Sequence, residues 1–354
     1  MKKGKHNILL VAHDRGGVNL LAPLLSYWME KEGRIEASFL GTPEIEYEVS
    51  SFMPSAKLIS RRYLVRRQKE HCWMFGNSEL EAVLEGGKWD FILTGTSIKS
   101  DLEKNIWRLA RKYSIPTAAI CDMWADYKRR FEQDSLTVLP NLLLVLDERM
   151  ALETKASLGN LIEIKIVGSP HFSHLIRVGK KWSRAARKVR FISEPVAAFF
   201  PEARIHEFNI AEIIIDALKE IGRTSDLVLR PHPQDDSEAW RRFAFTFRHL
   251  GVTIDSEPSW ACYRSTRMAI GLASMMLMEY TMVGVPVASF HLPGSDETYY
   301  CLPEKELGIT VLRSKSDLKD WLQDPPLPKV NPQFIQFHKS AIDRITELVL
   351  NRQF

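Results

Sequence analysis

The sequence predicts an α/β protein that contains two doubly wound domains. Its 354 residues exceed what one ordinary hydrophobic core accommodates, which favours two domains. Short apolar runs alternate with segments of helical periodicity, as in parallel sheets that are covered by helices on both faces. A basic stretch near residues 180–190 separates two such series. We therefore expect a first domain at residues 1–178, a second at residues 179–330, and a C-terminal helix within residues 331–354.

The first domain is expected to begin with a buried strand at residues 7–12. A glycine-containing turn follows, and the helix after it shows apolar residues at helical spacing from Val18 and ends at Gly33. The clearest later helix is expected at residues 101–113, before Ile115-Pro116. Five further apolar runs are predicted as strands, at residues 35–40, 91–94, 117–120, 142–146 and 164–167.

The second domain repeats the same alternation. A helix is predicted at residues 205–222, and strands at residues 189–192, 227–229, 252–254, 268–270 and 285–290. After Pro325-Pro326 a polar connection leads to a final helix at about residues 331–351, which we expect to cross back to the first domain.

Composition excludes several classes of protein. The chain has 48 basic and 44 acidic residues, and the resulting net charge of +4 does not indicate a nucleic-acid partner. Its four cysteines are far apart and form no CxxC pair, which argues against structural zinc and a disulfide framework. No segment approaches the roughly 20 apolar residues that a transmembrane helix needs. We expect a cytoplasmic protein.

The most informative motifs lie at two strand ends of the second domain. Arg230-Pro231-His232-Pro233 follows the strand at residues 227–229, and Gly271-Leu272-Ala273-Ser274 opens a helix that carries Glu279. Ligands of open α/β sheets bind at such strand ends. The backbone N–H groups and the dipole of a helix N-terminus favour phosphate. These motifs therefore predict a site for an anionic ligand.

This pair of motifs resembles the C-terminal domain of GT-B glycosyltransferases, which use nucleotide-activated sugars. The His-Pro dipeptide followed by a small-residue helix start is similar to the nucleotide-binding pair of bacterial sialyltransferases and related capsule enzymes. Residues 274–287 resemble the general GT-B pattern of Ser, then Glu, then Gly-x-Pro-Val. Sialyltransferases have two adjacent hydroxyl residues at the helix start, where this chain has Ala273 and Ser274.

The resemblance implies two Rossmann-like domains that face a cleft, with the nucleotide on the second domain and the acceptor on the first. It implies an inverting, metal-independent glycosyltransferase that moves a sugar from a UDP- or CMP-type donor to a glycan or lipid-linked acceptor. The implied setting is surface-polysaccharide or glycoconjugate assembly, with at most peripheral contact with the inner membrane. No cofactor and no metal site are expected.

Three alternatives stay open. The chain is also compatible with a nucleotide-sugar 2-epimerase or a cytidine-diphosphate-polyol phosphotransferase of the same fold. A non-catalytic GT-B binding subunit is the alternative from another class, and the lack of a convincing acid would favour it.

At the donor side, Arg230 and His232 are expected to contact phosphate, Arg230 as a bidentate pair. Ser274 would cap its helix and offer its N–H and hydroxyl to phosphate, and Glu279 would accept from ribose hydroxyls. For His232 the structural alternative is a histidine that the backbone satisfies, in a loop fixed by Pro231 and Pro233.

In the first domain, the loop His13-Asp14-Arg15-Gly16-Gly17 follows the first strand and is expected to face the cleft. Gly16 and Gly17 are predicted to contact the nucleotide donor, because glycines let backbone approach a ligand closely. They also suit a tight turn, and Asp14 also suits a helix cap. Asp122 follows the strand at residues 117–120 and lies near two aromatic residues, Trp124 and Tyr127.

An inverting transferase needs a base that takes the proton of the acceptor hydroxyl. Asp122 is the first choice and Asp14 the second, with His13 behind them; a helix cap is the structural alternative for Asp122. The basic run at residues 128–130 would meet a charged acceptor or form a solvated face. Basic and aromatic residues at 61–67 and 180–182 would meet lipid headgroups or solvent, and residues 294–297 would touch the donor sugar or form a turn.

Overall fold

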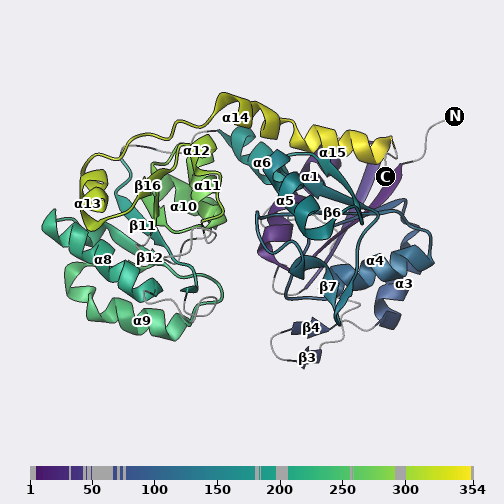
Figure 1. The fold of residues 1–354 in the computed structure, drawn as a ribbon, viewed down its shortest axis with the longest axis horizontal. Coiled ribbons are helices and arrows are strands. Elements are labelled where there is room, and N and C mark those ends of the chain that lie inside the picture. Colours follow the sequence, from purple (N-terminus) through teal and green to yellow (C-terminus); the bar gives the residue numbers. More distant parts are fainter. Residues whose placement is uncertain are drawn as a thin grey trace. The chain divides into compact units, whose positions relative to one another are not determined.

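In the computed structural model the chain divides into two compact units (Figure 1). Unit 1 consists of Met1–His174 and Gln336–Phe354, and unit 2 consists of Leu175–Ile335. The structure describes residues 5–31, 33–42, 45, 49, 67–69, 72–74, 77–179, 183, 185–196, 206–255, 257, 259–291 and 300–351. The exact boundaries predicted at residues 178 and 330 stay predictions.

Unit 1 is built on a six-stranded parallel sheet with the order β10-β9-β6-β5-β1-β2. From residue 8 onward β1 is completely buried, as expected for a parallel strand covered on both faces. From β1 the chain passes to β2 on one side and later returns to β5 on the other side. The topological switch point therefore lies between β1 and β5. The strands are β1 (His6–Ala12), β2 (Ile35–Gly41), β5 (Phe91–Thr94), β6 (Thr117–Ile120), β9 (Leu142–Val145) and β10 (Glu163–Ile166).

Helices of unit 1 alternate with these strands. The described helices are α1 (Arg15–Lys31), α3 (Asn77–Gly87), α4 (Leu102–Lys112), α5 (Glu148–Leu158), α6 (Pro170–Val178), which extends past the division, and α15 (Ala341–Leu350). Two short hairpins were not predicted, β3 (Arg67–Lys69) with β4 (Cys72–Met74), and β7 (Glu132–Gln133) with β8 (Leu136–Thr137).

The helix predicted at residues 331–351 is two helices, α14 (Pro332–Lys339) and α15. The hydroxyl of Ser173 donates to the carbonyl of Lys339 at 2.7 Å, and Ser340 begins the next helix. Side-chain bonding of a backbone carbonyl at this point competes with the helical ladder. α15 lies along α1 (Figure 1), where the indole of Trp28 donates to the hydroxyl of Thr346 at 2.8 Å.

Unit 2 repeats this architecture with a second six-stranded parallel sheet, in the order β13-β12-β11-β14-β15-β16. Its switch point lies between β11 and β14. The strands are β11 (Lys188–Ile192), β12 (Leu227–Arg230), β13 (Thr253–Ile254), β14 (Thr266–Gly271), β15 (Val287–Phe290) and β16 (Thr310–Leu312). The described helices are α8 (Glu207–Glu220), α9 (Ser237–Thr246), α10 (Ser259–Ser265), α11 (Met275–Met282), α12 (Glu304–Leu307) and α13 (Lys315–Gln323).

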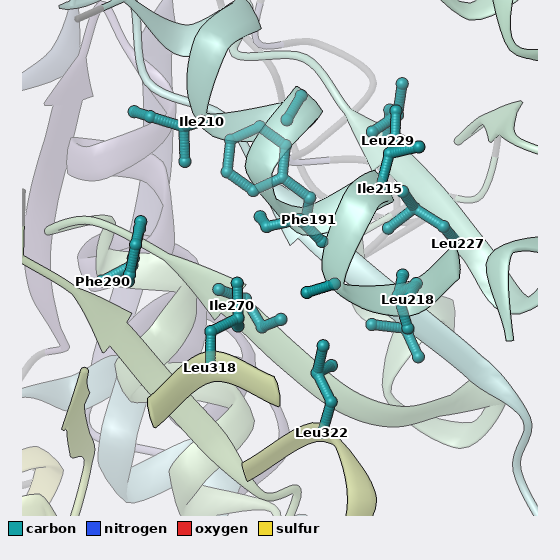
Figure 2. Packing of buried hydrophobic residues seen from close by; sticks show 14 of the residues in the cluster. Phe191, Ile210, Ile215, Leu218, Leu227, Leu229, Ile270, Phe290, Leu318 and Leu322 are labelled. Atoms are coloured by element: carbon teal, nitrogen blue, oxygen red, sulfur yellow. The ribbon is translucent and has the colours of Figure 1, made fainter. Parts of the chain in front are cut away.

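The core of unit 2 joins its sheet to two helices (Figure 2). Phe191 and Ile270 from neighbouring strands pack in one cluster with Leu218 of α8 and Leu318 of α13, and all four side chains are fully buried. Each such side chain contributes roughly 1.5–3 kcal/mol relative to exposure. The predicted α/β class with two doubly wound parallel sheets is confirmed. Within the described residues, the helices are all too short or too polar to cross a bilayer.

Candidate functional site

Candidate residues of unit 1 meet at the carboxyl end of its sheet, next to the switch point. A Cβ atom built on Gly16 would lie 1.9 Å from Oδ2 of Asp122, so the carboxylate of Asp122 rests against the Cα of this glycine. The loop after β1 and the loop after β6 are therefore in contact. We call Asp14, Gly16, Glu103, Asp122 and Arg130 the unit 1 site.

Backbone packing at this place is unusually tight. A Cβ on Gly17 would lie 2.9 Å from the Cβ of Ala12, and one on Gly95 would lie 3.1 Å from the Cα of Gly17. Asp14 accepts a hydrogen bond from the N–H of Gly17 at 2.9 Å, which is the capping role considered as its structural alternative. The glycines thus serve the turn and at the same time bring α1 onto the strand ends.

Arg130 holds the carboxylate of Asp122. Its Nη1 donates to Oδ1 of Asp122 at 2.6 Å and also to the carbonyl and hydroxyl of Thr96. The Arg130 side chain is 8% exposed, whereas those of Lys128 and Arg129 are 75% and 66% exposed. The solvated face considered for this run therefore holds for Lys128 and Arg129 but not for Arg130, which is a buried ion-pair partner, and contact of the run with an acceptor stays a prediction.

Burial raises the pKa of Asp122 above its usual value. The charge of Arg130 opposes this shift, and the nearby carboxylate of Asp14 adds to it. A carboxylate with a raised pKa is a stronger base than an ordinary aspartate, while its ion pair keeps the ionised form available.

Glu103 is a member of this site that sequence reasoning missed. It is 1% exposed, and its Oε1 accepts from the backbone N–H of His13 at 3.1 Å. Burial, followed by repulsion from Asp14, raises the pKa of Glu103 to about 8, so it is mainly neutral at pH 7. The signal was present, because Glu103 shares helical spacing with the buried residues Ile106, Trp107 and Ala110.

Two lysines shape the neighbouring loop between β5 and α4. Lys104 is buried and donates to the carbonyls of Ser97 and Ser100 at 3.0 and 2.8 Å. Burial lowers the pKa of Lys99, and attraction to Asp14 opposes that shift. Asp14 therefore acts electrostatically on Glu103, Asp122 and Lys99 together.

In unit 2, the switch point places another acid that the sequence did not single out. Oε2 of Glu194, just after β11, accepts from the backbone N–H of Ala273 at 2.9 Å. Ser274 begins α11 and accepts from the N–H of Met276 at 3.4 Å, as a helix cap. A protein carboxylate thus already uses one N–H group at the helix start where phosphate was expected.

Arg230 is engaged by a buried ionic network. Its Nη1 donates to Oδ2 of Asp255 at 2.6 Å and to the carbonyl of Glu257 at 2.9 Å, and Asp255 also pairs with Arg190. Burial acts to raise the pKa of Asp255, but the hydrogen bond and charge of Arg190, with hydrogen bonds from the Glu257 N–H and Arg230, outweigh it and lower that pKa. Arg230 consequently braces β12 against β13, and its phosphate contact stays a prediction.

His232 lies half-buried in a tight loop after β12. Its Nδ1 accepts from the N–H of Gln234 at 3.2 Å, and its own N–H donates to Asp235 at 2.7 Å. With Nδ1 as acceptor, the neutral ring carries its proton on Nε2, which suits donation to a ligand oxygen. The predicted structural and ligand roles are compatible here.

Glu279 points into the interior of unit 2. It is 6% exposed, and its Oε2 accepts from the hydroxyl of Tyr263 at 2.8 Å. Burial and the charge of Glu279 raise the pKa of Tyr263. The ribose contact that the resemblance implies for Glu279 stays a prediction.

In the part of the chain that the structure describes, no three His, Cys, Asp or Glu side chains group as a metal site. Cys121, Cys262 and Cys301 are buried free thiols. Residues 61–66, 180–182 and 294–297, for which lipid or donor contacts were considered, lie outside the described residues.

No protein-family model matches the chain, and no curated protein is significantly similar to it in sequence. Solved structures do match it over nearly its full length. UDP-GlcNAc 2-epimerase from Neisseria meningitidis, bound to UDP-GlcNAc, has a TM-score of 0.66 at 13% identity, covering 98% of this chain and 100% of that one. UDP-GlcNAc 2-epimerase from Methanocaldococcus jannaschii has a TM-score of 0.65 at 11% identity, covering 97% and 99%.

A third match is the glycotransferase of kitacinnamycin, with a TM-score of 0.56 at 14% identity, covering 98% of this chain and 95% of that one. The chain has the GT-B fold. The fold class predicted from the sequence is confirmed, whereas the sialyltransferase-like character of the His-Pro motif stays a prediction. At these identities the likeness shows the fold alone.

The contact between Gly16 and Asp122 predicts a sharp effect of one methyl group. Gly16→Ala should displace the Asp122 carboxylate or the loop, because the added Cβ would overlap Oδ2. We expect a loss of about 1–3 kcal/mol in unfolding free energy. Gly33→Ala is the matched control, since a Cβ there meets nothing within 4 Å. Equal stability of the two variants in urea denaturation would contradict the contact.

Glu103 predicts a pH-dependent stability. Its pKa is raised in the native state from 4.5 to about 8, so the native state binds this proton more tightly than the unfolded chain does. The stability of the wild type should therefore fall, relative to Glu103→Gln, as pH rises from about 4.5 to about 8. The difference should reach on the order of 5 kcal/mol and then level off. Melting of both proteins across this range measures it; parallel curves would show that Glu103 titrates normally.

Proposed function

We propose that this chain is an enzyme acting on a nucleotide-activated sugar, and that it transfers the sugar to an acceptor hydroxyl with inversion and without a metal ion. The observation that carries the proposal is the carboxylate of Asp122, which is ion-paired, has a raised pKa and rests against Gly16 at the switch point of unit 1. Perturbed carboxylates at strand ends favour an enzyme over a binding subunit.

Asp122 serves as the base in this mechanism. The acceptor hydroxyl attacks the anomeric carbon, its proton passes to Asp122, and the nucleotide leaves with the electron pair of the broken bond. Oδ1 is occupied by Arg130 at 2.6 Å, which makes Oδ2 the oxygen that takes the proton. Asp14 is the second choice, because it also caps α1 through Gly17.

Unit 2 binds the nucleotide in this proposal. The Nε2–H of His232 and the hydroxyl and N–H groups at the start of α11 meet the phosphates, where negative charge grows as the nucleotide leaves. Glu194 lies half-buried at the same sheet edge, and its carboxylate accepts hydrogen bonds from the hydroxyl groups of the nucleotide-sugar donor. We assign this role to Glu194 because Glu279 is buried. A UDP-type donor is favoured by the UDP-GlcNAc in a matching structure.

The acceptor in this proposal is a glycan or a lipid-linked glycan of surface-polysaccharide or glycoconjugate assembly. The enzyme reaches it from the cytoplasm with peripheral membrane contact, as the resemblance of the sequence motifs implies.

A second candidate is a nucleotide-sugar 2-epimerase. Epimerisation beside the anomeric carbon needs groups that remove a carbon-bound proton and return one from the other face. Asp14 and Asp122 place two carboxyl groups at one sheet edge, and the raised pKa of Asp122 suits it to take and return a proton. Two of the three matching structures described above are UDP-GlcNAc 2-epimerases.

Asp122→Asn tests the base. The amide keeps the shape of the side chain and still accepts from Arg130, so we expect kcat to fall by about 10²–10⁴ with nearly unchanged nucleotide affinity. Asp126→Asn is the matched control, because the Asp126 side chain is 42% exposed and pairs only at the surface with Arg129. Calorimetric titration with UDP and steady-state rates should be measured on both. Normal turnover in Asp122→Asn with a large loss in Asp14→Asn would move the base to Asp14.

Deuterium incorporation separates the two candidate reactions. UDP-GlcNAc incubated with the protein in D₂O, with a chelator and no acceptor, should keep its carbon-bound hydrogen beside the anomeric carbon if the protein is a transferase. A 2-epimerase would release the epimer with deuterium at that carbon.

If no uridine or cytidine nucleotide or nucleotide sugar raises the melting temperature, the nucleotide-sugar assignment is wrong. Activity that needs added magnesium or manganese would overturn the metal-free mechanism.

A further inference from the structure

Glu103 sits where its charge state decides the electrostatics of the unit 1 site. It lies in the first turn of α4 and reaches the backbone of His13, at the start of the loop that carries Asp14 and Gly16. Its Oε1 also lies 3.8 Å from the Cβ position of Gly95, beneath the tight contact between Gly95 and Gly17. This carboxyl group is thus hydrogen-bonded to the loop after β1 and lies near Gly95 in the loop after β5.

The second oxygen of Glu103 is buried without a hydrogen bond from the described residues. Among these residues Oε2 has no hydrogen-bond partner, and the side chain is 1% exposed. An ionised carboxylate that lacks partners on one oxygen is strongly disfavoured in the interior, whereas a neutral carboxylic acid is tolerated at much lower cost. The hydrogen bond from His13 occupies Oε1, which places the proton of the neutral acid on Oε2.

The groups that face Glu103 do not neutralise it. Asp14, from the loop after β1, opposes its ionisation, and Lys104 on its own helix favours it. Lys104 donates to the carbonyls of Ser97 and Ser100, so its ammonium group points toward that loop. Arg130 pairs with Asp122, and Lys99 is the cation attracted to Asp14. Of the three cations named, Lys104 is turned to these carbonyls and to Asp101 at 3.9 Å, and Arg130 and Lys99 act on Asp122 and Asp14, so no described cation hydrogen-bonds to Glu103.

We propose that Glu103 is a positioning residue of the unit 1 site, which in its neutral form holds the His13 backbone and keeps Asp14 beside Asp122. The proposal rests on the assignment of the unit 1 site as the catalytic site. Loss of the Glu103 proton places a third carboxylate next to Asp14 and Asp122, and mutual repulsion then displaces the loop that carries Asp14.

The pH dependence of activity tests the proposal. Wild type, Glu103→Gln and Glu103→Ala are compared in kcat/KM from pH 6 to pH 9.5. Glu103→Gln, which is neutral and similar in shape, should keep kcat/KM within about threefold of wild type at pH 7. In Glu103→Ala, kcat/KM should fall by at least about tenfold. Above about pH 8 wild-type activity should fall tenfold per pH unit, and this limb should be absent in Glu103→Gln.

Glu148→Gln is the matched control, because Glu148 occupies the first turn of α5 after a parallel strand but is exposed. Its profile should coincide with that of the wild type. The proposal fails if Glu103→Gln shows the same alkaline limb as the wild type, or if it is as inactive as Glu103→Ala while remaining folded by circular dichroism.

A ligand-independent readout separates this proposal from the proposed function. Difference infrared spectroscopy of wild type against Glu103→Gln should detect a protonated carboxyl group at pH 7 that disappears above about pH 8. The amide resonances of His13 and Gly17 should shift over the same range in the wild type only. A protein that is inactive on every nucleotide sugar but shows these changes would refute the function and retain Glu103 as the positioning group. A protein that is active on a nucleotide sugar but shows neither the infrared change nor the amide shifts would support the function and refute the role of Glu103.

Discussion

Close backbone approach at Gly16, Gly17 and Gly95 is the constraint on which the unit 1 site depends. A side chain on Gly17 would collide with Ala12, and one on Gly16 would collide with the carboxylate of Asp122. The absence of side chains lets the first turn of α1 rest directly on the ends of β1 and β5. Residues that are distant in sequence, Asp14, Glu103 and Asp122, consequently share one small volume. The chemistry that we assign to this unit follows from that crowding.

Crowding also sets the electrostatics. Three carboxyl groups in a poorly solvated region cannot all be ionised without compensation, and burial raises the pKa of both Glu103 and Asp122. The structure reconciles this through Arg130, which is buried against Asp122, and through the proton on Glu103. Unit 2 uses another solution at the end of β12, where Arg190 and Arg230 share Asp255. There the carboxylate is held ionised and its pKa is lowered.

The strands were predictable because parallel strands buried on both faces read as continuous apolar runs, as at residues 8–12 and 142–145. The short strand β16 and helix α13 were not predicted, and the break at Ser340 depends on a bond from Ser173, which no local pattern reveals. Loop motifs indicated which residues reach the strand ends. They did not indicate direction, so the inward orientation of Arg130 and Glu279 was missed. Glu103 could have been predicted from its helical spacing with Ile106 and Ala110. A charged residue on the apolar face of a helix is buried, and a buried charged group indicates a structural or functional role.

The hydrogen bond between the Trp28 indole and the Thr346 hydroxyl affects the order in which the two units can fold during translation. It joins the first helix of the chain to the last described helix, so unit 1 is assembled from two segments that flank unit 2 in the sequence. Unit 2 is continuous and can fold as soon as it leaves the ribosome. The buried face of Trp28 must wait through the synthesis of all of unit 2 before its partner emerges. During translation, the N-terminal segment of unit 1 is therefore made before unit 2 but completes its packing only after unit 2 has been made.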